Sequence, residues 1–204
     1  LFGLSNDKRR YVSLSDGGHF ENLGIYELVR RRCALIIACD AEEDAEQHFQ
    51  GLGSAIRKCR TDFGVEIDVD IEPLRKLDST RRSRAHCAVG TICYPETDPL
   101  TGRRITGTLF YVKSSLTGDE PEDVLEYESY QPAFPHQSTA DQFFDESQFE
   151  SYRRLGYHIA ERNFHLLERI VELVEQSRST DPGAQLDPAL ELDSLREAIR
   201  APAG

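Results

Sequence analysis

A single carboxylate followed by two glycines is the most distinctive chemical feature of the sequence. Asp16, Gly17 and Gly18 stand between a short apolar run at residues 11–14 and a helical pattern that starts after Asn22. Two glycines allow positive φ and a close approach of another backbone, and ligands of open α/β sheets bind beyond the carboxyl ends of strands. Asp16 is therefore a candidate catalytic residue. An ordinary turn, in which Asp16 bonds to local amides, explains the same three residues.

The sequence offers few other motifs for chemistry. The acidic stretch at residues 40–46 lacks the glycine and the distal glutamate of a calcium loop, so we expect a solvated loop there. The six histidines form no HExxH pair, and no GxSxG nucleophile elbow occurs in the 204 residues. We therefore expect no metal and no cofactor, and a hydrolase dyad or triad cannot be completed from this chain.

Composition and charge limit the class of partner and the compartment. The net charge of −12 at pH 7 repels the phosphates of nucleic acids, so we expect no nucleic-acid binding. Five cysteines without a CxxC pair predict reduced thiols. No apolar run reaches the length of about 18 residues that a membrane span needs. We predict a cytoplasmic protein, and association with a membrane surface through regions outside these residues stays open.

The elements that must position Asp16 form a predicted strand–helix–strand unit. Residues 11–14 read as the first strand, and Asn22 is the expected N-cap of the helix that follows. Residues 34–39 are a continuous apolar run, which is typical of a strand buried on both faces of a parallel sheet. Together they predict a right-handed βαβ unit with Asp16 at the end of its first strand.

Further along the chain the patterns alternate between helix and strand. Periodicity predicts helices over residues 47–60, 148–174 and 186–199, and a half-exposed strand over 65–71. Residues 85–94 and 105–113, separated by turn signals, predict an antiparallel β-hairpin. We expect an α/β fold with a mostly parallel sheet, this hairpin and a long C-terminal helix.

The stretch LSDGGHFENLG resembles the second catalytic motif of the patatin-like phospholipases. In that motif Asp-Gly-Gly ends a strand and an asparagine follows at the start of a helix; Asp16, Gly17, Gly18 and Asn22 match these positions. Many members carry a proline two residues after the asparagine, where this chain has Gly24. The stretches GTLFYVKSSLTGDEP and FPHQSTADQFFDESQFESYRRLGYHIA look like segments of larger bacterial members. The resemblance ends at residue 177.

This resemblance implies a three-layer α/β/α sandwich and a serine–aspartate dyad that hydrolyses acyl esters of lipids. Asp16 would be the dyad acid, while the nucleophilic serine and a glycine-rich oxyanion loop would come from an upstream part of the same polypeptide. Residues 1–177 would then be the C-terminal portion of the hydrolase domain, and residues 178–204 a tail with a short helix. The isolated chain should be inactive.

Two further expectations follow from the resemblance and from the residues around Asp16. A lipid ester would need an apolar pocket, and the candidates to line the substrate site are His19, Phe20, Leu23, Phe134, His136 and Phe143. The alternative function is a non-catalytic regulatory or binding module of the same fold. An upstream GxSxG elbow would distinguish the enzyme from the module.

Overall fold

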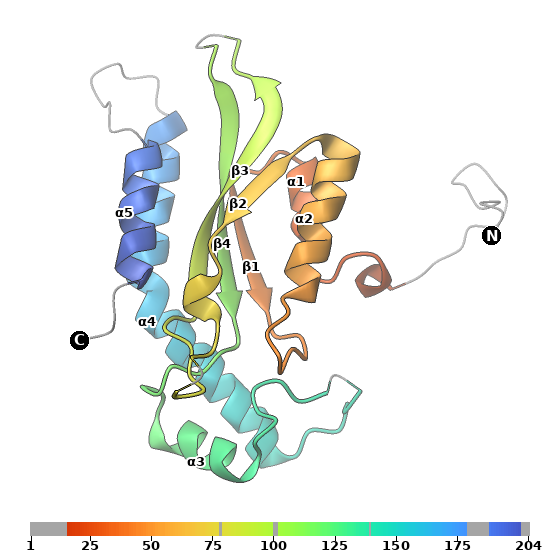
Figure 1. Ribbon diagram of the computed structural model, residues 1–204, viewed down its shortest axis with the longest axis vertical. Helices are drawn as coiled ribbons and strands as arrows, with labels where there is room; N and C mark the ends of the chain where they lie inside the picture. Colours follow the sequence, from red (N-terminus) through yellow and green to blue (C-terminus); the bar gives the residue numbers. More distant parts are fainter. Residues whose placement is uncertain (1–15, 78, 100–101, 139, 179–187, 201–204) are drawn as a thin grey trace, which may run out of the picture.

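The computed structural model of the protein describes residues 16–77, 79–99, 102–138, 140–178 and 188–200. Figure 1 shows how the elements are arranged. In chain order they are η1 (Gly17–His19), α1 (Ile25–Arg30), β1 (Leu35–Asp40), α2 (Gln50–Phe63), β2 (Glu66–Val69), η2 (Glu72–Leu74), β3 (Cys87–Thr97), β4 (Arg104–Lys113), α3 (Glu122–Tyr130), α4 (Glu146–Arg178) and α5 (Pro188–Arg200). The α/β class expected from the sequence is confirmed.

The described strands form one mixed sheet in the order β1-β4-β3-β2. β1 runs parallel to β4, whereas β3 pairs antiparallel with both β4 and β2. The predicted hairpin is therefore confirmed as β3 and β4. The expectation of a mostly parallel sheet does not hold for these four strands, because the hairpin and β2 contribute two antiparallel pairings against one parallel pairing.

Helices pack on both faces of this sheet (Figure 1). On one face Ile25 of α1 and Leu52 of α2 join a buried cluster with Leu109 of β4. On the other face Ile170 of α4 and Leu192 of α5 join a second cluster. Each fully buried aliphatic side chain contributes about 1.5–3 kcal/mol, so the sheet is held from both sides. The long helix predicted over residues 148–174 is confirmed as α4, and the short helix predicted over 186–199 is confirmed as α5, which belongs to this packing.

The entry into α1 differs from the expectation that Asn22 caps the helix. The N-cap is Gly24, whose φ of 73° is in the left-handed region that favours glycine. The Asn22 side chain instead donates from Nδ2 to Oε1 of Glu42, 2.6 Å away. The Glu21 carboxylate accepts bonds from the backbone N–H groups of Leu23 and Tyr26. A carboxylate one residue earlier thus satisfies the helix start and leaves Asn22 to bond elsewhere.

β1 is not buried on both faces, as its apolar run predicts. Its burial alternates: Ile36, Ala38 and Asp40 are buried, while Ile37 is 46% exposed and Cys39 is exposed. The reason is that β1 is the edge strand of the described sheet, and α4 packs against its neighbour β4. The strand predicted at residues 11–14 lies outside the described residues.

The helix predicted over residues 47–60 begins three residues later, at Gln50. The Asp44 carboxylate accepts bonds from the backbone N–H groups of His48 and Phe49, and Phe49 has a φ of 52°. This left-handed residue delays the helix although the apolar periodicity starts earlier. The neighbouring strand β2 is confirmed over a shorter range than predicted, and α4 is longer than predicted at both ends.

A buried ion pair joins the carboxyl ends of the two parallel strands. Lys113 Nζ of β4 lies 2.8 Å from Asp40 Oδ1 of β1, and both side chains are at most 1% exposed. The Tyr111 hydroxyl donates to the other oxygen of Asp40. Burial, reinforced by the charge of Asp40, raises the pKa of Tyr111 above its usual range. The loop after β1 completes the group: the backbone N–H of Glu42 donates to Asp40 Oδ1, and Lys113 Nζ donates to the backbone oxygen of Glu42.

We expect Lys113→Met to destabilise the protein by about 3–5 kcal/mol, because it leaves the Asp40 carboxylate buried without its cation. Urea unfolding measured at pH 7 gives the change. Arg30→Met is the matched control, since Arg30 pairs with Glu27 in solvent and its loss should leave the unfolding midpoint nearly unchanged. Equal midpoints for Lys113→Met and the control would show that the buried pair contributes nothing to the fold.

Candidate functional site

The Asp16 turn is a short 3₁₀ helix with its carboxylate at the start. Asp16 Oδ1 accepts a bond of 3.0 Å from the backbone N–H of Gly18, and its backbone oxygen accepts one of 3.1 Å from His19. Asp16, Gly17 and Gly18 are all exposed. Asp16 thus makes the local bond of an ordinary turn, and its carboxylate still faces solvent where another group can reach it.

Of the two glycines, only the second has a described side chain close to where a Cβ would lie. A Cβ on Gly18 would lie 2.7 Å from Asn22 Oδ1, whereas one on Gly17 meets nothing within 4 Å among the described atoms. Asn22 in turn bonds to Glu42, two residues beyond the end of β1. A Cβ on Gly51 of α2 would lie 2.1 Å from Glu42 Oε2. The side chains of Asn22 and Glu42 therefore occupy the space over two glycines, where the turn, the loop after β1 and the start of α2 lie close together.

An acidic hollow of about 680 Å³ lies beside the turn. Gly18, His19 and Phe20 line it together with the loop after β1 and the first turns of α2. Phe20 is 50% exposed, and Lys58 Nζ sits 4.2 Å from the centre of its ring. Leu23 packs against the core cluster of α1 and α2 instead. The structure thus brings His19 and Phe20 to the turn, but the hollow they line is polar.

Three other predicted pocket residues lie elsewhere. Phe134 is buried among α3 and α4, where its ring packs edge-on against Tyr127 and Tyr152. His136 is buried, and neither ring nitrogen bonds to a described residue. Phe143 is 95% exposed. Among the described residues, none of these three lines the hollow beside Asp16.

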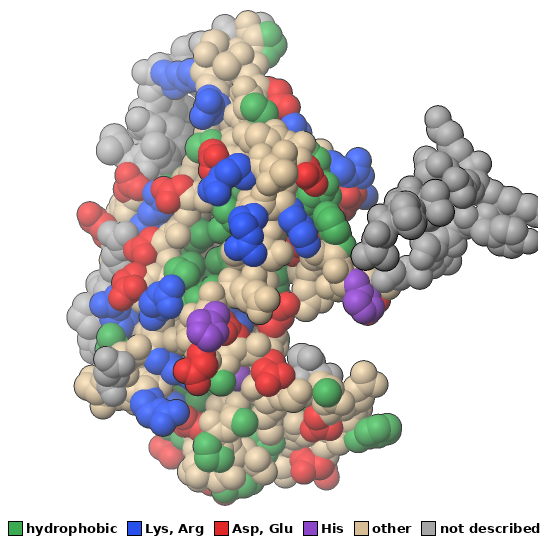
Figure 2. All heavy atoms as spheres, turned by 45° about the vertical axis from the view of Figure 1, so that its right-hand side comes forward, with side chains coloured by type: hydrophobic (Ala, Val, Ile, Leu, Met, Phe, Trp, Pro, Cys, Tyr) green, Lys and Arg blue, Asp and Glu red, His purple; other side chains and the backbone are tan. Residues whose placement is uncertain are grey.

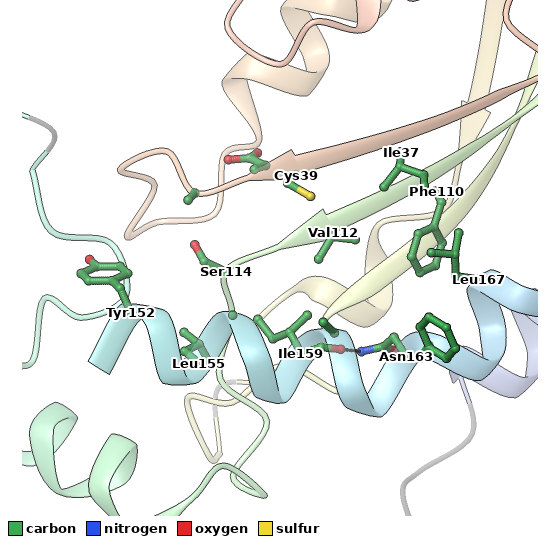
Figure 3. A pocket seen from close by; sticks show the side chains of 15 residues that line it. Ile37, Cys39, Phe110, Val112, Ser114, Tyr152, Leu155, Ile159, Asn163 and Leu167 are labelled. Atoms are coloured by element: carbon green, nitrogen blue, oxygen red, sulfur yellow. Dashed lines mark hydrogen bonds between the residues drawn. The ribbon is translucent and has the colours of Figure 1, made fainter. Parts of the chain in front are cut away.

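An apolar hollow of about 420 Å³ opens between β1, β4 and α4. Figure 3 shows Cys39 and Val112 pointing from the strands toward α4, with Leu155 and Ile159 on the helix below them. Figure 2 shows the surface hollowed between the part of the molecule that carries the sheet and the part that carries α3. The sequence does not reveal this hollow, because the run that contains Cys39 predicts burial on both faces.

The loop at residues 40–46 separates the two hollows. Asp40 and Ala41 line the apolar hollow, while Glu42 and its successors line the acidic one. Ser114, directly after β4, also lines the apolar hollow; its buried hydroxyl makes no side-chain bond with the described residues. The apolar hollow and the acidic hollow therefore lie on either side of the loop that follows the carboxyl end of β1.

Comparisons with protein-family models, with curated proteins and with solved structures found no match. In the described part of the chain no helix has both the length and the apolar character of a membrane span. The features that can carry a function are the apolar hollow, the acidic hollow with the Asp16 turn beside it, and the loop at residues 40–46 that separates the two hollows.

His136 should make stability depend on pH. Burial, followed by the charges of Lys76 and Lys113, lowers the pKa of His136 from 6.5 to about 4. Between these values the unfolded chain holds a proton that the folded protein does not, so folding is disfavoured as the pH falls. The contribution of neutral His136 is complete above pH 6.5 and is lost by pH 4.

We expect wild type to lose up to about 1.4 kcal/mol more per pH unit than His136→Leu across that window. Urea unfolding at several pH values measures the difference between the two curves. His48→Leu, which removes an exposed histidine, is the control and should follow wild type. Parallel curves for wild type and His136→Leu would contradict the lowered pKa.

Proposed function

We propose that the protein is a lipid acyl ester hydrolase of the patatin-like type, with Asp16 as the acid of a serine–aspartate dyad. The observation that carries the proposal is an exposed carboxylate on a glycine turn that is tied, through Asn22 and Glu42, to the carboxyl end of β1. Ligands of α/β sheets bind at that end. In this proposal the serine and the oxyanion loop come from an upstream part of the same polypeptide, and the complete fold is a three-layer α/β/α sandwich.

The chemistry explains why the acid must be accessible. A serine hydroxyl becomes a good nucleophile only when a base takes its proton during attack. Without an intervening histidine, the carboxylate has to hydrogen-bond the hydroxyl directly, at about 2.6–3.2 Å. One oxygen of Asp16 already accepts from Gly18, which orients the carboxylate while it remains exposed. An acyl chain that displaces water from the turn would strengthen the base.

The apolar hollow is our proposed site for the acyl chain. Its lining from β1, β4 and α4 is almost entirely aliphatic and aromatic, and it ends at Asp40 and Ala41. The same loop continues into Glu42, which contacts the Asp16 turn through Asn22. An acyl tail in the hollow would therefore place its ester near the loop at residues 40–46. This loop lies between the apolar hollow and the turn that carries Asp16.

Asp16→Asn keeps the size of the side chain and removes the base. In the polypeptide that includes the upstream part, we expect kcat for a p-nitrophenyl ester to fall by about 10²–10⁴-fold with the thermal midpoint unchanged. Both quantities are measured on one sample, and His19→Ala is the control that should keep most of the activity. A lower midpoint with normal kcat would make Asp16 a turn residue and remove it from the reaction.

Gly156 allows the acyl site to be tested separately. It lines the apolar hollow from α4, and a Cβ built on it meets no described heavy atom within 4 Å. Gly156→Leu should fill part of the hollow while Gly156→Ala leaves it open, and both should favour the helix. Excluding two methylenes of substrate removes about 1.6 kcal/mol of binding, or about fifteen-fold in kcat/KM.

We expect that loss in Gly156→Leu for long-chain esters and no loss for the butyrate ester. Gly156→Ala should resemble wild type with both substrates. An equal loss with short and long esters in Gly156→Leu would mean that the acyl chain does not enter this hollow.

A second candidate function is a binding module without catalysis. The exposed side chains of Ile37 and Cys39 on β1 favour this function, because they line the apolar hollow. An exposed apolar surface of this kind can bind a partner without any nucleophile. Labelling by a fluorophosphonate probe separates the two: the hydrolase is labelled through its serine, whereas the module is not.

A further inference from the structure

Two histidines and two acids from three separate segments meet on the side of the sheet covered by α4. His86 directly precedes β3, Asp119 and Glu120 lie between β4 and α3, and His158 belongs to α4. One donor atom from each lies within 4.8 Å of the others. The side chains of His86, Glu120 and His158 are at most 10% exposed, while Asp119 is about one-third exposed.

We propose that these four residues form a binding site for a divalent transition-metal ion, with Zn²⁺ as the preferred ion. Two imidazole nitrogens and two carboxylate oxygens are donors that Zn²⁺ uses, and the two carboxylates balance its charge. Calcium, which takes oxygen ligands, suits this donor set poorly. The inference does not depend on the proposed hydrolase activity.

The distances suit a tetrahedral ion. His86 Nε2 lies 3.8 Å from Glu120 Oε1 and 3.9 Å from Asp119 Oδ1, and His158 Nε2 lies 3.1 Å from the same oxygen of Asp119. Ligands about 2.0–2.2 Å from a tetrahedral zinc are separated from each other by about 3.4 Å. Small side-chain rotations would therefore bring the four donors to the ion.

The hydrogen bonds around His86 direct a lone pair toward the acids. Ser115 Oγ donates its one proton to a carbonyl, that of Ala85 at 3.2 Å or Lys113 at 3.4 Å. With that proton on a carbonyl, Ser115 Oγ accepts from His86 Nδ1, 3.2 Å away, and this arrangement puts the ring proton on Nδ1 and leaves the lone pair on Nε2. Such fixing of the tautomer from outside is usual for metal-ligating histidines.

Too few protons then remain at the centre of the cluster. Thr117 Oγ1 lies 2.5 Å from Asp119, 3.2 Å from His86 Nε2 and 3.3 Å from Glu120. The one hydroxyl proton can serve only one of these three acceptors. Asp119 and Glu120 have other donors, so His86 Nε2 is the acceptor left without a proton when the hydroxyl turns to Asp119. A cation resolves this deficit once the His158 proton moves to Nδ1 and the Thr117 hydroxyl turns aside.

Outer contacts and an entry path complete the site. Both oxygens of Glu120 accept backbone N–H groups, from Thr117 at 2.6 Å and Gly118 at 2.8 Å. Arg162 holds the second oxygen of Asp119 at 2.5 Å. A hollow of about 570 Å³, lined by His86, Thr117 and Asp119 among others, connects the cluster to solvent. An ion can therefore reach the cluster from solvent.

The test uses the purified 204-residue chain, stripped with a chelator and titrated with Zn²⁺ in a calorimeter. We expect one Zn²⁺ per chain and a higher thermal midpoint in its presence. Asp119→Asn and His158→Gln should each weaken binding about tenfold or more and lose the rise in midpoint. His165→Gln is the matched control, because His165 lies on the same helix, borders the same hollow and is not a ligand.

Co²⁺ should give the visible d–d spectrum of a tetrahedral site in wild type and in His165→Gln, and circular dichroism checks that each variant is folded. Three outcomes would overturn the proposal: no Zn²⁺ binding by the stripped chain, binding that is unchanged in Asp119→Asn and His158→Gln, or a preference for Ca²⁺ over Zn²⁺.

Discussion

The ion pair between Asp40 and Lys113 is the interaction on which the described structure depends most. It joins the carboxyl ends of two parallel strands at a point where neither charge reaches water. Such a pair is costly to bury and is tolerated only when its remaining hydrogen-bonding groups are satisfied. Tyr111 and the backbone N–H of Glu42 supply those bonds to Asp40. These bonds fix the first residues of the loop after β1. The same loop separates the apolar hollow from the acidic one.

α4 extends this organisation to the other face of the sheet. Leu155, His158 and Ile159 are all buried and lie within about one turn of one another. The two aliphatic residues line the apolar hollow, while His158 reaches the acids that precede α3. One helix therefore closes the proposed acyl site and contributes to the proposed metal site. A shift of α4 along its axis would disturb both, which links the two features through packing although they use different residues.

The sequence predicted those features that depend on short-range periodicity. The hairpin, the long helix and the C-terminal helix follow from patterns within each segment. Prediction from the sequence failed where a residue distant in sequence decides how a side chain bonds or how far it is buried. Glu42 takes the side chain of Asn22, which the helix start was expected to use. The apolar run of β1 predicts burial on both faces, but it cannot show which elements pack against the strand. In the structure the face of β1 that carries Ile37 is exposed.

The candidate sites show the same division between local and distant information. The motif around Asp16 is contiguous, so its turn could be recognised directly, and the structure does contain that turn. The His86 cluster comes from three segments with no common motif, and each of its residues alone resembles an ordinary surface or core residue. Sequence spacing therefore gave the expectation of no metal, which the spatial arrangement now calls into question.

The charge around Asp16 narrows the substrate that the proposed hydrolase could accept. The described lining of the adjacent hollow includes five acidic side chains and one lysine, which are Glu21, Glu42, Glu43, Asp44, Glu46 and Lys58. Two like charges about 4 Å apart repel by about 1 kcal/mol even in water, and by more near a protein surface. An anionic lipid headgroup in this hollow would meet several such repulsions. An uncharged ester, or a headgroup that presents a cation toward the acids, would not. The apolar hollow on the other side of the loop imposes no such restriction on the acyl chain, so selectivity in this arrangement would come from the headgroup.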